Sequence, residues 1–281
     1  MIWYAPYELV ARRALNARAT ELRRRGALIR VDDGFADVHP WPELGDAPLE
    51  EQLALLARGE TTSLTRASLR FARLDAEARA AGRWLFEGVT IPESHWPGGE
   101  PPSGFDTVKL KCGPDFDASS LPDGLRIRLD FNATLDAEMF ARIAATLPDS
   151  VEFVEDPCPY DADVWRELRA RTGVRLALDR RESVEGVDVL VVKPAVQDVP
   201  SVDRELVITS YMDHPLGQLA AALVASQSGT SDRCGVVTHV LYEPNEFSER
   251  LRIDGSRLVA PAGTGFGFDD LLEAQSWRKL A

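Results

Sequence analysis

The chain of 281 residues could form one large domain or two smaller ones, and its 44% hydrophobic content is ordinary for a folded protein. Its 45 acidic and 32 basic residues give a formal charge of −13, so we expect neither nucleic acid nor an anionic membrane as a partner. The three cysteines lack CxxC spacing, and the sequence shows neither a signal-peptide pattern nor an apolar run of about 20 residues. We therefore expect a cytoplasmic protein.

The first part of the chain predicts a small α+β unit. Residues 22–46 read as β-strands joined by turns, with Gly26 interrupting one run and a turn signal at residues 32–34. Two helices with apolar faces follow at residues 48–59 and 63–82, and each closes at a glycine. Strands followed by helices are typical of an α+β lobe.

From Trp84 onward, short apolar runs predict strands that are buried on both faces, as in a parallel sheet. Eight such runs lie at residues 83–91, 106–111, 125–131, 151–155, 174–179, 187–193, 205–210 and 234–240. Amphipathic helices are expected between several of them, at residues 135–149, 161–173 and 215–229.

Interleaved strands and helices predict a (β/α)8-type barrel over residues 84–240, beside an α+β capping domain of residues 1–83. The barrel stretch is shorter than the roughly 250 residues typical of this fold. The segments 94–104 and 183–186 cannot hold proper helices. We therefore expect a barrel with trimmed helices, and a tail of residues 241–281 that returns to the capping domain.

Three carboxylates, Asp130, Glu155 and Asp179, each end an apolar run. In a barrel they would lie at the C-terminal ends of their strands, where such enzymes carry their reactive groups. Asp130 or Asp179 alone is better explained as a helix cap, but three carboxylates on successive strands would repel one another without a cation. An oxygen-only ligand set favours Mg²⁺, and Mn²⁺ could replace it.

Two lysines precede these carboxylates and one follows them. Lys109 and Lys111 leave the same face of one strand, and a buried pair of ammonium groups would lower its own pKa, which would make one lysine a base near neutral pH. On an exposed edge the same pair would only aid solubility. Lys193 ends the most hydrophobic run, so it either pairs with a site carboxylate or faces the substrate. With a closed barrel, the pattern predicts removal of an α-proton from a carboxylate substrate held on a metal between two lysines.

These motifs resemble the enolase superfamily, in the subgroup related to muconate lactonizing enzyme. The resemblance is carried by Lys109-Leu-Lys111, Asp130-Phe-Asn132, Glu155-Asp156-Pro157, Asp179 and Lys193. Residues 22–46 resemble the N-terminal capping segment of o-succinylbenzoate synthases of menaquinone biosynthesis. The resemblance implies a carbon–oxygen lyase, a Mg²⁺-dependent dehydratase that converts 2-succinyl-6-hydroxy-2,4-cyclohexadiene-1-carboxylate to o-succinylbenzoate.

The resemblance also implies a role for each residue. Lys111 would remove the α-proton and return it to the leaving hydroxyl, with syn loss of water, while Lys193 would stabilise the anion from the opposite face. The other assignments are Mg²⁺ binding for Asp130, Glu155 and Asp179, support of the site for Lys109 and Asn132, and substrate contact for Ser210, Gly263 and Gly265. The trimmed outer helices put a helix-mediated dimer in doubt, so we expect a monomer.

Two alternatives stay open at this point. An N-acylamino acid racemase or dipeptide epimerase would carry the same lysines and carboxylates, and would use both Lys111 and Lys193 as acid and base. A non-catalytic protein on the same scaffold would have lost some of the five charged positions, and none is lost. The histidines, His39, His95, His214 and His239, lack metal-ligand spacing and are expected in the core or in loops.

Overall fold

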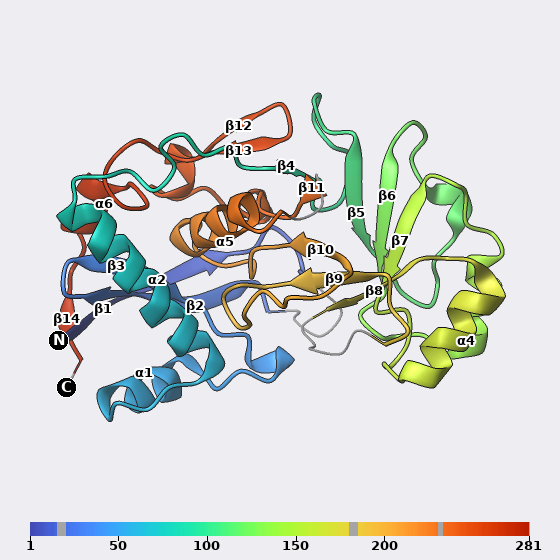
Figure 1. Ribbon diagram of the computed structural model, residues 1–281, viewed down its shortest axis with the longest axis horizontal. Coiled ribbons are helices and arrows are strands. Elements are labelled where there is room, and N and C mark those ends of the chain that lie inside the picture. The colour runs from blue at the N-terminus through green and yellow to red at the C-terminus, as the bar shows by residue number, and fades with distance from the viewer. Residues whose placement is uncertain (16–20, 180–184, 230–232, 281) are drawn as a thin grey trace.

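The computed structural model describes residues 1–15, 21–179, 185–229 and 233–280 (Figure 1). The N-terminal part forms an antiparallel sheet of order β14-β1-β2-β3. Its strands are β1 (Ile2–Val10), β2 (Arg23–Val31), β3 (Gly34–Val38) and β14 (Arg278–Lys279). A 3₁₀ turn, η1 (Pro42–Leu44), leads to the helices α1 (Leu49–Ala57) and α2 (Ser63–Ala80).

Both helices of this part lie where the sequence predicted them. Gly59 and Gly82 follow their C-termini with φ of 77° and 62°, a backbone conformation in which a Cβ is costly. The predicted break at Gly26 was wrong, because β2 runs straight through this residue. A Cβ at Gly26 would lie 2.3 Å from the hydroxyl oxygen of Tyr7, so the glycine makes room for the phenol ring instead of ending the strand.

The central part is a curled parallel sheet of α/β-barrel type, of order β10-β9-β8-β7-β6-β5. Its strands are β5 (Thr107–Lys111), β6 (Arg126–Asp130), β7 (Val151–Glu155), β8 (Leu176–Asp179), β9 (Val189–Val192) and β10 (Glu205–Ile208). Two short strands, β4 (Glu93–Ser94) and β11 (Arg233–Cys234), pair in parallel with each other. Parallel bridges from Trp96 to Val108 and from Thr209 to Gly235 connect them to β5 and β10, so the pairing runs around a ring.

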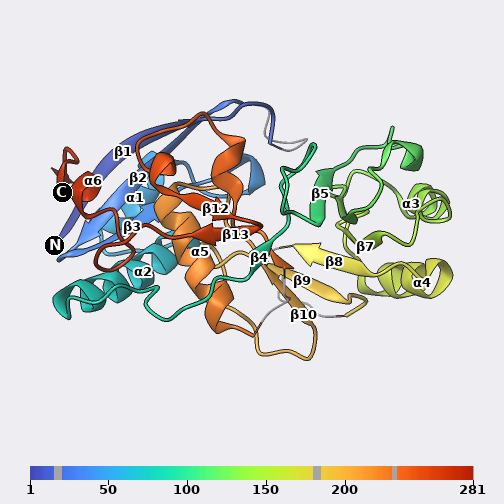
Figure 2. The same ribbon diagram turned by 90° about the horizontal axis from the view of Figure 1, so that it is seen from above.

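The helices of the barrel part follow the predicted order, and several connections are short. They are α3 (Ala137–Ala144), α4 (Ala162–Thr172) and α5 (Pro215–Gln227). Residues 95–106 form a loop, and residues 113–124 contain one 3₁₀ turn, η2 (Ala118–Ser120). Of the predicted loop at 183–186, residues 183–184 lie outside the described residues. Figure 2 shows α3 and α4 beyond the β5–β8 half of the sheet, and α5 between the barrel and the N-terminal sheet.

Two predicted barrel strands differ from the structure. The run at 83–91 is no barrel strand, because it forms only an isolated bridge from Trp84 to Gly265, and the first strand, β4, follows it. Its side chains are apolar because they pack in the core, where Phe86 and Ile91 are buried. The run at 234–240 is strand-like only at its start and then turns into η3 (Thr238–Leu241).

The C-terminal segment touches both parts of the molecule. It contains η4 (Ser248–Arg250), β12 (Arg252–Asp254), β13 (Arg257–Val259) and α6 (Asp269–Glu273) before β14. The β12–β13 hairpin joins β4, while β14 pairs with β1 and brings the two chain ends to the same side of the molecule (Figure 1). One large hydrophobic core runs through the sheet, the barrel and this segment.

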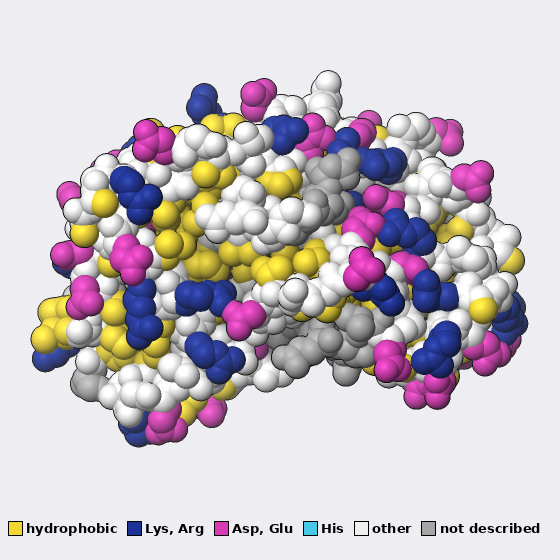
Figure 3. All heavy atoms as spheres, in the orientation of Figure 1, with side chains coloured by type: hydrophobic (Ala, Val, Ile, Leu, Met, Phe, Trp, Pro, Cys, Tyr) yellow, Lys and Arg dark blue, Asp and Glu magenta, His cyan; other side chains and the backbone are white. Residues whose placement is uncertain are grey.

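The surface mixes both signs of charge. Figure 3 shows acidic and basic side chains interspersed over one face, with apolar side chains gathered near its centre. Within the described ranges, no helix is long and apolar enough to cross a membrane.

Candidate active site

The strand register collects five charged side chains at one end of the barrel. Lys111, Asp130, Glu155 and Asp179 are the last residues of β5, β6, β7 and β8, and Lys193 directly follows β9. Lys111 pairs in register with Asp130, and Asp130 with Glu155, so these residues lie at one level of the sheet. The C-terminal ends of parallel strands are the edge where barrel enzymes place their chemistry.

Ammonium groups contact each carboxylate of this cluster. Lys109 donates from Nζ to both oxygens of Glu155, at 2.7 and 2.6 Å, and lies 2.8 Å from Asp130 Oδ2. Lys111 donates to the same Asp130 oxygen at 2.5 Å and reaches Asn132 Oδ1 at 3.4 Å. Lys193 forms an ion pair with Asp179 that is not shared with the other two lysines.

The carboxylates of the cluster stabilise the charge of Lys109. Burial acts to lower the pKa of Lys109, but Asp130, Glu155 and Asp179 act more strongly and hold that pKa well above its ordinary value. The prediction that the lysine pair depresses its own pKa was therefore wrong for Lys109, because carboxylates surround its ammonium group. Burial and the charge of Asp130 raise the pKa of Glu155 to about 7. The cluster therefore combines an ammonium group with a raised pKa, on Lys109, and a carboxyl group with a raised pKa, on Glu155.

The donor chemistry of the cluster fits a hard cation. The three carboxylates come from neighbouring strands, and Asp179 Oδ1 is buried without a hydrogen-bond partner among the described residues. Among the described residues, no group of three acidic, histidine or cysteine side chains is arranged to hold a metal ion, and lysines occupy oxygens of Asp130, Glu155 and Asp179. A cation bound to these oxygens would take the place of ammonium groups, including that of Lys193 on Asp179.

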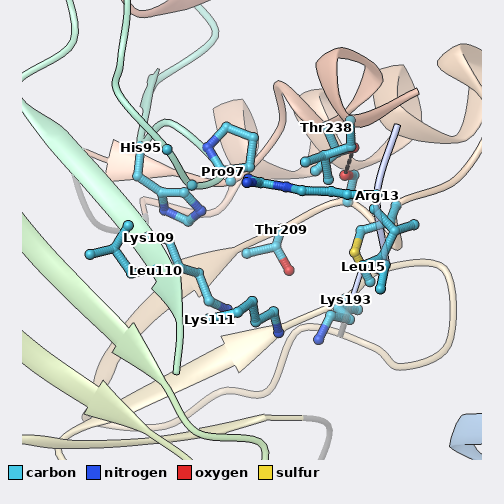
Figure 4. Close-up of a pocket in the computed structure, with 17 residues that line it drawn as sticks. Arg13, Leu15, His95, Pro97, Lys109, Leu110, Lys111, Lys193, Thr209 and Thr238 are labelled. Carbon is cyan, nitrogen blue, oxygen red and sulfur yellow. Dashed lines mark hydrogen bonds between the residues drawn. The ribbon is translucent and has the colours of Figure 1, made fainter. Parts of the chain in front are cut away.

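A cavity of about 450 Å³ opens beside the cluster (Figure 4). Figure 4 shows the side chains of Lys111 and Lys193 extending into it from the two flanks. Ser210 lines it as well, and donates to or accepts from Thr238 at 2.6 Å. A space of this size suits a small-molecule substrate.

Gly263 and Gly265 do not line this cavity, so their assignment to substrate contact is corrected. A Cβ at Gly265 would lie 1.9 Å from Asp75 Oδ1, and one at Gly263 would lie 2.1 Å from Asp269 Oδ2. Gly265 therefore makes room for the carboxylate of Asp75 on α2, and Gly263 for that of Asp269 on α6.

Sequence reasoning missed four polar residues of the cavity wall. Arg13, His95, Thr209 and Thr238 all line the cavity. His95 and Thr209 are 4% and 6% exposed, and each follows a short barrel strand whose sequence has no distinctive pattern. The alternation of side chains along a strand is the only sequence signal that could have placed these residues at the cavity. For His95 this signal was too weak, because β4 has only two residues.

The chain is similar to known proteins in both its N-terminal part and its barrel part. Residues 2–78 match the family model described as o-succinylbenzoate synthase, N-terminal domain, and residues 102–197 match the model described as enolase C-terminal domain-like. The chain is 36% identical to the o-succinylbenzoate synthase of Bdellovibrio bacteriovorus, over 99% of this chain and 98% of that protein.

Two solved structures share the fold. A dipeptide epimerase from Enterococcus faecalis, complexed with Mg and the dipeptide L-Leu-L-Tyr, is 14% identical with a TM-score of 0.77, over 95% of this chain and 98% of that one. An enolase superfamily member from Roseovarius nubinhibens, complexed with magnesium, is 16% identical with a TM-score of 0.75, over 100% and 97%. From the full-length similarity and the barrel, we conclude that the chain belongs to the o-succinylbenzoate synthase family of the enolase superfamily.

Proposed function

We propose that this enzyme is a Mg²⁺-dependent dehydratase that forms o-succinylbenzoate from 2-succinyl-6-hydroxy-2,4-cyclohexadiene-1-carboxylate. The observation that carries the proposal is that Lys111 and Lys193 flank one cavity, with three carboxylates on the strands between them. The relative from Bdellovibrio bacteriovorus bears the corresponding name and is similar over its whole length.

Lys111 is the group that moves the proton. Its side chain is 39% exposed and lines the cavity, whereas the side chain of Lys109 is 13% exposed and is held by two carboxylates. Lys111 takes the proton from the ring carbon that bears the carboxylate and returns it to the hydroxyl on the neighbouring ring carbon. The C–H and C–O bonds break, water leaves, and the ring becomes aromatic.

The other residues hold the charge that this transfer creates. Bound Mg²⁺, held by Asp130, Glu155 and Asp179, would supply positive charge at the substrate carboxylate. Lys193 approaches from the opposite side of the cavity as a second cation and stabilises the anion. Lys109 keeps Glu155 and Asp130 in place, and Asn132 orients Lys111 through its side-chain oxygen.

An ultraviolet assay for the aromatic product tests the reaction. Lys111→Ala should lower kcat by at least about 100-fold, the range by which positioned acid–base groups accelerate proton transfer. Lys279→Ala is the matched control, because this lysine is exposed on β14, away from the cavity. If Lys111→Ala keeps the activity of Lys279→Ala, the proposed proton transfer is wrong.

Lys193→Arg separates dehydration from racemisation. A racemase or dipeptide epimerase needs Lys193 as a base, and arginine cannot serve because its pKa stays above about 12. A dehydratase needs only a cation at this position, so the variant should keep a measurable part of its activity. Complete loss of dehydration in Lys193→Arg, together with turnover of an N-acylamino acid or a dipeptide by the unchanged enzyme, would favour the alternative.

The remaining parts of the proposal concern organisation and metal choice. We divide the chain into a capping domain of residues 1–83, a barrel of residues 84–240 and a C-terminal segment, in keeping with the separate antiparallel and parallel sheets. The outer ring between β4 and β6 is built from loops, which supports a monomer, and light scattering of the purified protein measures this directly.

Mn²⁺ should replace Mg²⁺ at the oxygen ligands, and the acidic chain with unpaired cysteines suits the cytoplasm.

A further inference from the structure

Two buried carboxyl groups meet where the N-terminal sheet contacts α5 (Figure 2). Asp37 lies on β3, Asp213 lies just before α5, and both are buried. A Cβ at Gly217 would lie 2.6 Å from Asp213 Oδ2 and 2.8 Å from Asp37 Oδ2, so both oxygens border one small space. The cavity there has a volume of about 20 Å³, which is enough for one water molecule. Two carboxylates this close in a buried site would repel each other strongly.

The cavity is bordered by hydrogen-bond acceptors. The Tyr7 hydroxyl donates its only proton to Asp37 Oδ1 at 2.5 Å, so it must accept from His39 Nδ1, which lies 2.9 Å away. The proton of the neutral imidazole is therefore on Nδ1, and Nε2 is an acceptor. In the described part of the chain, His39 Nε2 and Asp213 Oδ1 are buried without a hydrogen-bond partner. Both residues line the cavity, and a proton on Asp213 would supply the donor that these acceptors need.

The carboxyl pair lies beside a loop that belongs to the substrate cavity. The backbone N–H of His214 donates to Asp37 Oδ2 at 3.1 Å, and Trp41 Nε1 donates to the carbonyl oxygen of Tyr211 at 2.8 Å. Met212, between these two contacts, lines the substrate cavity with φ of 51°, a backbone conformation that is costly for a residue other than glycine. Contacts from the N-terminal part therefore hold the loop between β10 and α5 in its position.

The other titratable groups around the pair keep their charge near neutral pH. Burial raises the pKa of Tyr7 on β1 and of Tyr242 after η3 well above its ordinary value. Burial also lowers the pKa of His39 and of His214 to about 3. Arg24 on β2, whose charge acts on His39, stays positive. The side chains of α2 and of the C-terminal segment that border the cavity are uncharged.

That leaves the two carboxyl groups themselves to titrate. Burial raises the pKa of Asp37 to about 7, against hydrogen bonds from Tyr7 and His214 that favour its charged form. Burial and the charge of Asp37 raise the pKa of Asp213 well above its ordinary value. Asp37, which accepts these hydrogen bonds, is therefore the carboxylate, and Asp213 is the group that retains a proton as the pH rises.

We propose that Asp37 and Asp213 form a proton-dependent latch between the capping domain and the loop that carries Met212. With one proton on the pair, Asp213 donates across the cavity toward Asp37, and β3 and the start of α5 stay together. When that proton leaves to solvent, two carboxylates face each other, and the loop moves away from β3. The latch does not depend on the chemistry of the substrate cavity, whereas its expected effect on KM rests on the proposed function.

Hydrogen exchange measured by mass spectrometry tests the latch without substrate. From about pH 6 to about pH 10, the protection of amides between β10 and α5, relative to those of α3 in the same sample, should fall at least about tenfold, because two like charges about 5 Å apart in a protein interior repel by more than that factor. Asp213→Asn carries a donor that cannot be lost, so its protection should stay at the level seen at low pH. Asp203→Asn, at an exposed aspartate before β10, is the matched control and should behave as the unchanged protein.

Kinetics provide the second readout. KM should rise about threefold or more over the same pH range, with a smaller change in kcat because Lys111 lies on β5, and Asp213→Asn should remove this rise. Constant protection in the unchanged protein, or the same loss of protection in Asp213→Asn, would overturn the latch. A loss of protection that Asp213→Asn abolishes, in a protein that does not form o-succinylbenzoate, would support the latch and refute the proposed function.

Gly217→Ala tests the same geometry if Asp213→Asn does not fold. Its Cβ would lie inside van der Waals contact of both carboxyl groups, so it should separate them at every pH. Protection of the loop in Gly217→Ala should therefore be low already at about pH 6, and full protection there would contradict the latch.

Discussion

Replacing Gly26 with alanine should loosen the contact between the N-terminal sheet and the barrel. The new Cβ would lie 2.3 Å from the Tyr7 hydroxyl oxygen and 2.4 Å from Cζ, far inside van der Waals contact. The phenol must therefore move. Its hydroxyl donates to Asp37 Oδ1 at 2.5 Å and lies 2.9 Å from His39 Nδ1, and its ring contacts His214 at the start of α5.

The size of the effect follows from these contacts. Loss of a buried hydrogen bond to a carboxyl group costs about 1.5–3 kcal/mol when the group is charged. Alanine in a strand interior returns about 0.5–1 kcal/mol relative to glycine. Gly26→Ala should therefore lower the free energy of unfolding by about 1–2 kcal/mol. With Tyr7→Ala already present the clash is gone, and the same substitution should be neutral or stabilising.

Urea denaturation of the two single variants and the double variant measures the coupling between the two positions. We expect a coupling energy of about 2 kcal/mol, which is in the range found for residues in direct contact. A coupling below about 0.5 kcal/mol, or a Gly26→Ala variant as stable as the unchanged protein, would refute the reasoning that this glycine exists to admit the ring.

Three further predictions concern buried charges. Lys109→Met leaves Glu155 and Asp130 without their shared cation, so it should cost about 3 kcal/mol of stability in EDTA, and Mg²⁺ should restore part of it; equal urea midpoints for the variant and the unchanged protein would contradict this. Asp179→Asn should weaken Mg²⁺ binding by more than about 100-fold in calorimetric titration, since even groups that only support metal ligands matter about 10- to 100-fold; unchanged binding would favour a non-catalytic scaffold. Burial raises the pKa of Asp37 from 3.8 to about 7, so between these values the folded state binds a proton that the unfolded state does not, and the free energy of unfolding should fall as the pH rises from about 4 to about 7. Asp37→Asn should flatten this slope in urea denaturation at a series of pH values, and an unchanged slope would exclude Asp37 as its cause.

The sequence predicted the catalytic strands well because their pattern is local. Runs such as residues 106–111 and 151–155 are short, apolar and end in a charged residue, so adjacent residues predict both the strand and the position of its last residue. The first strand was predicted too early in the chain, because residues 83–91 are more apolar than β4 itself. In that segment, hydrophobicity reports burial in a core and not membership of the sheet.

The roles of individual polar residues depended on what came to lie beside them. The order Lys109, Lys111, Asp130, Glu155, Asp179 and Lys193 on successive apolar runs is visible in the sequence, and the family resemblance follows from it. Only the tertiary structure decided that carboxylates hold the charge on Lys109, because a pKa is set by groups distant in the chain.

The same holds for the glycines and for the far wall of the cavity. Gly26 and Gly265 look alike in sequence as turn residues, yet one admits the ring of Tyr7 and the other the carboxylate of Asp75. Local sequence determined which residues end the strands, because strand formation follows the nearby hydrophobic pattern. Closure of the barrel decided which of them meet, because it brings His95 beside Thr209 across more than a hundred residues of chain.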